Sequence, residues 1–457
     1  MRGVRSSTVC AATLIALLAS GPAASAPAAP ALVPFHAADP AEPDSTFDGF
    51  LDQLADSTSD YFGISAVPPD TAGFDSSLAY GIANPRVRRV RVRPSFYPDL
   101  KFSRVDGPVY ALVAGLNGVP RLGELRAEVS YASGPNDVLW QGRWTRLFGG
   151  GDHRWRATAG GGLTTESMDR ERSSVRLASV RAFLFGKDSH HYLRRKGFDL
   201  GLQRELSFAQ LGIRYRDMDE SAIATSAGWN LFHNPLSTFD NLPAANGRAR
   251  EFEYAATVHV DPFPIQAEVI HQTSGAGIGS DFEYRRTRVA ASSDIGLGQW
   301  ATLVPQAVYG RLTGQAIPQA AFFLGGSRSL RSLSSGDRGG TGYALARIEL
   351  IGADDVLELL RIPHPAFLPL QLGAFTGVGA VWGQDPFGGP TREGDNWPDD
   401  RHWVSEAGVS VIYQPGIPNP TSLVRLNYAW ALGPAHESTR FSLSFSHALD
   451  FLRTFRN

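Results

Sequence analysis

Residues 251–260 read EFEYAATVHV, and polar and apolar side chains alternate along them. Phe252 and Tyr254 occupy even positions, whereas Glu251 and Glu253 occupy odd positions. Successive side chains of a β-strand leave opposite faces of the sheet, so this period of two predicts a strand with one apolar and one polar face. The carboxylates on the polar face indicate that this side of the strand meets water.

The same period of two recurs along most of the chain. In 124–131, Leu125 and Val129 oppose Glu124 and Glu128. Further segments with this pattern are 138–147, 198–206, 209–217, 343–350, 370–382, 403–413, 421–432 and 439–446. Repeated strands of this kind predict an all-β fold, either a soluble β-sandwich or solenoid or a transmembrane β-barrel.

Three features of these segments favour the transmembrane barrel. Their length of about ten residues suits a tilted strand that crosses a bilayer. Their polar face carries full charges, which suits a water-filled lumen. Aromatic residues lie toward the strand ends, as in the interfacial girdles of such barrels; they are Trp140, Trp144, Trp300, Trp382, Trp403, Tyr413 and Trp430.

Short and long connections are expected to lie at opposite ends of this barrel. The expected short turns are Asn117–Arg121, Phe148–Asp152, Ser207–Phe208, Asp261–Pro264, Gly296–Gly298 and Pro415–Pro420. The expected long loops are 163–196, 218–249, 313–340 and 383–401. Ten strands precede the 313–340 loop and five follow it, and a first strand at 87–94 makes the total even. We therefore expect a transmembrane antiparallel β-barrel of 16 strands over residues 87–457, with 12 or 14 strands as the alternatives.

The first 26 residues have the pattern of a signal peptide. Arg2 and Arg5 precede an apolar core, and the small residues 24–26 offer a cleavage site. Export followed by barrel formation predicts the bacterial outer membrane as the location. Cys10, the only cysteine, lies in this signal, so the mature chain is expected to lack thiols. Residues 27–86 are expected to form a periplasmic linker or a small plug.

Composition narrows the classes of function. The chain carries 43 Lys+Arg and 45 Asp+Glu, a formal net charge of -2, which argues against a nucleic-acid partner. Neither a Gly-x-Ser-x-Gly nucleophile elbow nor a His-Glu-x-x-His zinc helix occurs in the sequence. We therefore expect no enzyme activity, no catalytic residues, no cofactor and no metal site. An outer-membrane hydrolase is the weakest alternative.

The most specific local pattern is FFLGGSRSLRSL at residues 322–333, which a strand at 343–350 follows. Gly325 and Gly326 precede Leu330 and Arg331, and these four residues form a candidate loop-lock motif. The segment resembles the sixth extracellular loop of the bacterial surface antigen superfamily of outer-membrane barrels, the BamA/TamA-type assembly barrels and two-partner secretion barrels. The resemblance implies that the 313–340 loop folds back into the lumen. A strand of that family is also similar to the segment 375–382, with Phe375, Gly377 and Gly379.

The chain departs from the family pattern at two places, one in the 322–333 segment and one in the 375–382 segment. Residues 330–333 keep the arginine but lack the family's glycine and aromatic residue, and Gly377 stands where the family has a lumen-facing aspartate. Alternation places Arg347 and Glu349 on the lumen face, so both are candidate lumen partners and Glu349 is the candidate partner of Arg331. Residues 27–86 are also too few for the repeated periplasmic modules of the assembly barrels.

The resemblance implies a barrel that inserts or translocates protein or lipid. Its partners would be outer-membrane lipid and unfolded outer-membrane or secreted proteins, with no nucleic acid. Gly377 and the missing periplasmic modules motivate an alternative, in which the chain is a passive diffusion channel or a structural barrel.

Overall fold

The computed structural model describes residues 93–445, with gaps at 120–121, 151–152, 169–181, 184–189, 228–229, 233–240, 261–263, 327, 334–337, 365–368, 387, 389–396, 399–402, 414–423 and 433–439. The expected signal peptide, the segment 27–86 and most of the expected strand 87–94 lie outside the described residues. No helix in the described part of the chain is both long and apolar enough to cross a bilayer.

Sixteen long β-strands make up nearly all of the secondary structure in the described part of the chain. They are β1 (Arg93–Ser103), β2 (Gly107–Val119), β3 (Gly123–Ala132), β4 (Asp137–Gly150), β5 (His153–Ser167), β6 (Tyr192–Glu205), β7 (Ala209–Ala222), β8 (Gly247–Val260), β9 (Ile265–Ser274), β10 (Tyr284–Ser293), β12 (Ala301–Gly314), β15 (Gly342–Gly352), β16 (Leu370–Trp382), β17 (Val404–Tyr413), β18 (Val424–Leu432) and β19 (Arg440–Phe445). The short β11 (Ile295–Leu297) extends the pairing with β12, and β13 (Phe322–Leu324) pairs with β14 (Arg338–Gly340) in a separate hairpin.

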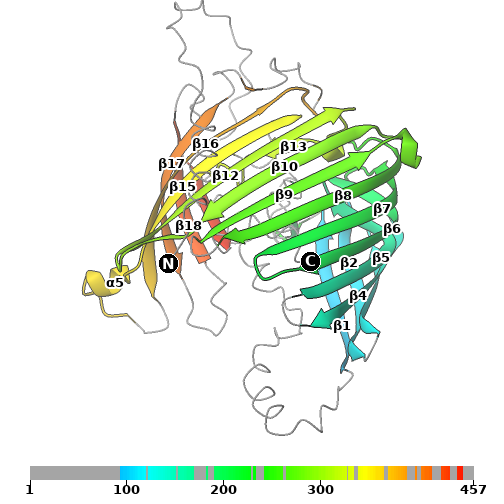
Figure 1. Cartoon of the computed structure of the whole chain (residues 1–457), viewed down its shortest axis with the longest axis horizontal. Coiled ribbons are helices and arrows are strands. Elements are labelled where there is room, and N and C mark those ends of the chain that lie inside the picture. Colours follow the sequence, from blue (N-terminus) through cyan, green and yellow to red (C-terminus); the bar gives the residue numbers. More distant parts are fainter. Residues whose placement is uncertain are drawn as a thin grey trace, which may run out of the picture. The chain divides into compact units, whose positions relative to one another are not determined.

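Each long strand pairs antiparallel with the next one along the chain, from β1–β2 to β18–β19 (Figure 1). The expected 16-strand antiparallel barrel, with five strands after the 313–340 loop, is confirmed. The first described strand begins at Arg93, so it shares only two residues with the strand expected at 87–94. Residues 95–103 of β1 were not expected to be a strand, because Pro94 directly precedes this segment, Pro98 lies in it, and proline in a sequence argues against a strand.

The sheet is curved. This follows from a contact between two connections whose strands are far apart in the series. The hydroxyl of Ser226, between β7 and β8, donates to the carbonyl of Val105, between β1 and β2, at 2.6 Å. In a flat sheet, five strand spacings of about 4.8 Å would separate β2 from β7 by roughly 24 Å. The curvature gives the sheet an inner face and an outer face.

The inner face is charged and buried, whereas the outer face is apolar and exposed. In β3, Glu128 is buried while Val129 is exposed, and in β15, Glu349 is buried while Ile348 is exposed. The same arrangement holds at positions along β6–β10 and β17, whereas the inner face of β16 carries Phe375 between Gly373 and Gly377 and no charge. A soluble β-sandwich buries its apolar faces against each other, so this pattern excludes the sandwich and fits strands that face lipid.

Aromatic side chains lie near both ends of the strands, as expected of interfacial girdles. At the end with the long loops, Trp382 packs against Tyr309 and Trp397, and Trp397 packs against Trp403. Trp300 is exposed in the β10–β12 turn at the other end. Trp382 itself is 1% exposed, so its aromatic neighbours cover it.

The long connections β5–β6, β7–β8, β12–β15 and β16–β17 share one end of the strands, as expected. The tight turns β2–β3, β4–β5, β6–β7 and β8–β9 share the other end. The β15–β16 connection is an exception at the short-turn end, because it spans 353–369 and holds the helix α5 (Val356–Leu359). This connection is absent from the expected turns and loops.

Candidate functional site

The described residues of the connection between β12 and β15, 315–326, 328–333 and 338–341, lie against the inner face of the sheet; we call them the strap. The strap contains a 3-10 turn at Pro318–Ala320 and the β13–β14 hairpin. Its apolar side chains pack with lumen-facing residues of the wall in one hydrophobic cluster, to which the strap contributes Ile317, Ala320, Phe322, Leu324, Leu330 and Leu333. The 313–340 loop therefore folds inward, as the resemblance implied.

The glycine pair of the motif shapes the turn that follows β13. Gly325 and Gly326 have φ angles of 109° and 98°, which side chains with a Cβ rarely adopt. The Gly325 amide donates to the Ser329 hydroxyl at 3.3 Å, and that hydroxyl lies 3.1 Å from the Tyr343 hydroxyl. The glycines thus turn the chain so that residues 329–333 reach the wall.

Arg331 forms the first anchor of the strap. Its guanidinium donates to Glu349 on β15 at 2.9 Å and to Asn427 on β18 at 3.0 Å. The same group lies 4.3 Å from the ring centroid of Phe375 on β16, within the range of a cation–π contact. The structure therefore brings the candidate residues Arg331, Glu349 and Phe375 together, with Arg331 only 3% exposed.

Glu349 is shared between two arginines in this anchor. Its carboxylate also accepts from Arg425 on β18 at 2.6 Å, and its side chain is fully buried. The neighbouring carboxylate of Glu406 on β17 accepts from the backbone N–H of Ser332 at 2.8 Å. Buried charges require such partners, because an uncompensated charge in a poorly hydrated site is strongly unfavourable.

Arg347, the other candidate lumen partner, holds the backbone of the strap. Its guanidinium donates to the carbonyl of Ser329 at 3.1 Å and to the side chain of Gln306 at 2.7 Å. The two candidates on β15 thus have different contacts. Glu349 accepts from the side chain of Arg331, and Arg347 donates to the backbone carbonyl of Ser329, two residues before Arg331.

Two glycines of β16 make room for the strap. A Cβ on Gly377 would lie 3.3 Å from Leu330, and one on Gly379 would lie 2.9 Å from Leu324. Any side chain at these positions would press on the strap, so both glycines allow its close approach to the wall. Gly377 therefore accommodates Leu330, while Glu349 supplies a carboxylate to Arg331, as alternation predicted.

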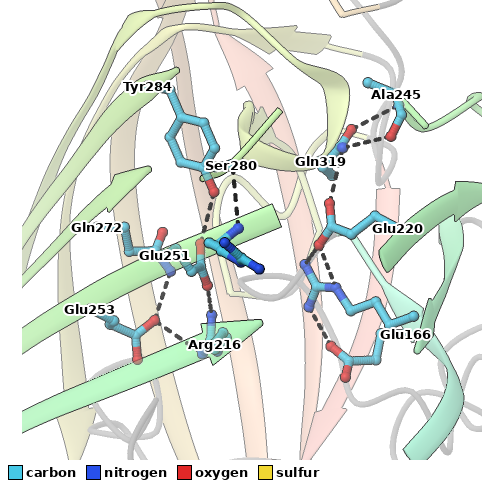
Figure 2. Close-up of polar contacts among 12 residues, drawn as sticks. Glu166, Arg216, Glu220, Ala245, Glu251, Glu253, Gln272, Ser280, Tyr284 and Gln319 are labelled. Carbon is cyan, nitrogen blue, oxygen red and sulfur yellow. Dashed lines mark hydrogen bonds and ion pairs between the residues drawn. The ribbon is translucent and has the colours of Figure 1, made fainter. Parts of the chain in front are cut away.

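Gln319 forms a second anchor at a different part of the wall (Figure 2). Its side-chain amide donates to the carbonyl of Ala245 and to the carboxylate of Glu220 on β7, both at 3.0 Å. Its side-chain carbonyl accepts from the N–H of Ala245 at 3.0 Å. Gln319 thereby joins the strap to both β7 and the β7–β8 connection.

Around this anchor runs a band of ion pairs on the inner face of β5–β10. Arg195 bridges Glu220 at 2.6 Å and Glu166 at 2.5 Å. Arg216 contacts both Glu251 and Glu253. Figure 2 also shows Gln272, which donates to Glu253, and Tyr284, which donates to Glu251. The band fixes the side chain of Glu220 on which the second anchor depends.

Arg286 on β10 adds a third contact between the strap and this wall. It donates to the carbonyl of Ala320 at 3.1 Å and lies 4.2 Å from the ring centroid of Phe322. The strap is thus held on one side by β7–β10 and on the other by β15–β18. Sequence reasoning missed Gln319, Arg286 and Glu406, because nothing local marks a neutral side chain or a lumen-facing charge as a contact of a distant loop.

No known protein-family profile and no curated protein matches the chain. Among solved structures, CdiB from Acinetobacter baumannii is similar at 10% identity and a TM-score of 0.42, covering 78% of this chain and 59% of CdiB. This chain therefore spans less than two thirds of that protein's length. CdiB from Escherichia coli is similar at 12% identity and 0.39, covering 78% and 68%. The outer membrane protein opdK from Pseudomonas aeruginosa is similar at 12% identity and 0.34, covering 77% and 94%.

Proposed function

We propose that this chain is a bacterial outer-membrane barrel that inserts or translocates protein or lipid. In this proposal the strap closes the lumen at rest and moves when a substrate is handled. The observation that carries the proposal is the anchoring of Arg331 to Glu349 and Asn427, with Leu330 packed at Gly377. A strap fixed by side-chain contacts, rather than by the strand pairing of the wall, can leave and return without unfolding the barrel.

The edge of β1 supports a lateral route between the first and last strands of the series. The N–H of Ser133 donates to the carbonyl of Pro108 on β2 at 3.0 Å, so the backbone of Pro108 faces β3. Neighbouring residues of a strand direct their backbone groups to opposite sides. The backbone of Ala111 on β2 therefore faces β1. The backbone of its register partner on β1, Asp99, accordingly faces β2.

Pro98 lies one position before Asp99 and Pro94 lies five positions before it. Both differences are odd, so the backbones of the two prolines face the other edge of β1. That edge is where the first strand would meet β19 or an incoming strand. Proline has no N–H, so at both positions this edge can accept but cannot donate a hydrogen bond. A seam with fewer donors opens more easily, which suits lateral release into the membrane.

Replacing Pro98 with alanine should strengthen the seam, because it restores one backbone donor at this edge. One hydrogen bond typically adds about 1 kcal/mol to the free energy of unfolding. We expect the folded barrel to resist heating in detergent better, and substrate handling to weaken. Pro108→Ala is the matched control, since its new N–H faces the paired strand β3. If both variants change activity equally, the donor-poor edge has no special role.

A covalent tether tests whether the strap must move. With Cys10 replaced by serine, cysteines at Leu330 and Gly377 can be joined by a short thiol-specific crosslinker whose spacer contains a disulfide, because a Cβ on Gly377 would lie 3.3 Å from Cδ2 of Leu330. We expect the tethered barrel to fold but to fail in complementing a deletion strain, scored as outer-membrane permeability to a large antibiotic. Reduction of the disulfide should restore complementation. Full complementation by the tethered protein would contradict a moving strap and favour a structural barrel.

The passive channel remains the second candidate, and the charged inner face of β5–β10 favours it. Pairs such as Arg195–Glu220 and Arg288–Glu268 line that face. A hydrated lumen of this kind supports ion passage. The two candidates differ in the conductance of the resting protein. A barrel closed by the strap should have a small conductance, whereas a passive channel should have a large and steady one.

A further inference from the structure

An exposed apolar patch lies at the short-turn end of the wall. Leu359 and Leu360, at the end of α5, are 70% and 62% exposed, and Ile362 is 46% exposed. Trp300 in the β10–β12 turn is also exposed, and its carbonyl accepts from the N–H of Ala353 at 2.9 Å, at the start of the α5 connection. Large apolar side chains gathered in this way mark an interaction surface.

The backbone that carries the patch has a defined shape. The carboxylate of Asp355 accepts from the N–H of Leu357 at 2.9 Å and from that of Leu370 at 3.2 Å. Its other oxygen lies 2.8 Å from the His364 ring. The N–H of Ile362 donates to the carbonyl of Leu357 at 2.8 Å and closes the helix end. The exposed leucines are therefore presented by a bonded connection with both ends tied down.

Arg361 stands between the apolar residues in an unusual conformation. Its φ angle is 56°, in the left-handed region where helices commonly place a glycine. Its side chain is exposed. A long cationic side chain beside apolar ones is typical of segments that lie at a membrane surface, because the cation reaches the headgroups while the apolar groups enter the bilayer.

The position of the connection indicates what covers it. Figure 1 shows α5 beyond the ends of β12 and β15, away from the strands of the opposite wall. The adjoining outer faces of β15 and β16 expose Ile348, Leu350 and Leu372, which belong to the lipid-facing surface. The patch therefore continues that surface past the strand ends, at the level where a tryptophan such as Trp300 marks the membrane interface.

We propose that residues 359–362, together with Trp300, bind the phospholipid surface on the short-turn side of the membrane. The apolar side chains would enter the interface beside β12, β15 and β16, and Arg361 would contact lipid phosphate. The anchor would fix the depth of this part of the wall in the bilayer. It depends on the barrel fold alone, so it stands or falls independently of what the barrel transports.

Fluorescence quenching in vesicles tests this anchor. Leu360→Cys in a Cys10→Ser background is labelled with an environment-sensitive dye, and the full chain is reconstituted into vesicles of phosphatidylcholine and phosphatidylglycerol. Asp354→Cys, exposed in the same connection, is the aqueous control, and Ile348→Cys on β15 is the lipid control. We expect nitroxides attached near the lipid headgroups to quench the Leu360 probe severalfold more than the Asp354 probe. Aqueous iodide should show the reverse order.

Equal quenching of the Leu360 and Asp354 probes by both reagents would overturn the proposal. The patch would then face water, and its partner would be a soluble protein or another segment of this chain. Nitroxide-bearing lipids must quench the Ile348 probe whether or not residues 359–362 bind the membrane. This control separates a failed anchor from a failed reconstitution.

Discussion

Glutamine in place of Glu349 should destabilise the barrel by about 3–5 kcal/mol, the cost of leaving a buried charge without its partner. Glu349 is fully buried and accepts from Arg331 at 2.9 Å and from Arg425 at 2.6 Å. Glutamine keeps the shape but removes the negative charge, so two buried guanidinium groups lose their shared counter-ion. The measurement is urea unfolding of the reconstituted barrel. The fraction that remains folded at each urea concentration is read from its distinct mobility on a gel.

Two comparisons give this prediction its specificity. Glu283→Gln removes a carboxylate from an exposed loop and should leave the unfolding midpoint unchanged. Arg331→Met should cost less than Glu349→Gln, because Glu349 keeps its pairing with Arg425. If Glu349→Gln unfolds at the same urea concentration as Glu283→Gln, the buried ion pairs contribute nothing to stability.

Alternation alone predicted which side chains face the lumen, because the strand period of two is a local property of the backbone. It placed Arg347 and Glu349 on one face of the 343–350 strand and Ile348 on the other, as the structure has them. It missed residues 95–103 of the first strand, where Pro94 and Pro98 argue against a strand. The backbones of both prolines face away from β2. The pairing of β1 with β2 therefore needs no N–H from either residue, and the structure tolerates them there.

The sequence also indicated that Arg331 needs a carboxylate, since a buried guanidinium is costly without one. It did not reveal the rest of the cluster, which depends on register between strands. Gly377 pairs with Arg347 on one side and with Glu406 on the other, and only this register brings Glu406 to Ser332. No local pattern fixes such a register over a connection as long as 383–403.

Removing both anchors of the strap should open the lumen, whereas removing either one should not. Arg331 holds the strap at β15 and β18, and Gln319 holds it at β7 and Ala245, so each anchor can keep the strap in place alone. We expect wild type, Arg331→Ala and Gln319→Ala to show small conductance in planar bilayers. The double variant should conduct severalfold more, as a non-additive effect of two contacts on one element.

The matched control combines Arg331→Ala with Gln315→Ala, which removes the same kind of side chain from the exposed start of the strap. This pair should conduct like Arg331→Ala alone, because Gln315 contacts only the N–H of Glu283 through its side chain in the described structure, at 3.3 Å. A large steady conductance in the wild type would instead identify a passive channel. An unchanged conductance in the double variant would mean that the remaining contacts hold the strap without either anchor. These are the hydrogen bonds made by Arg286, Arg347 and Glu406 and the apolar packing of residues such as Phe322 and Leu330.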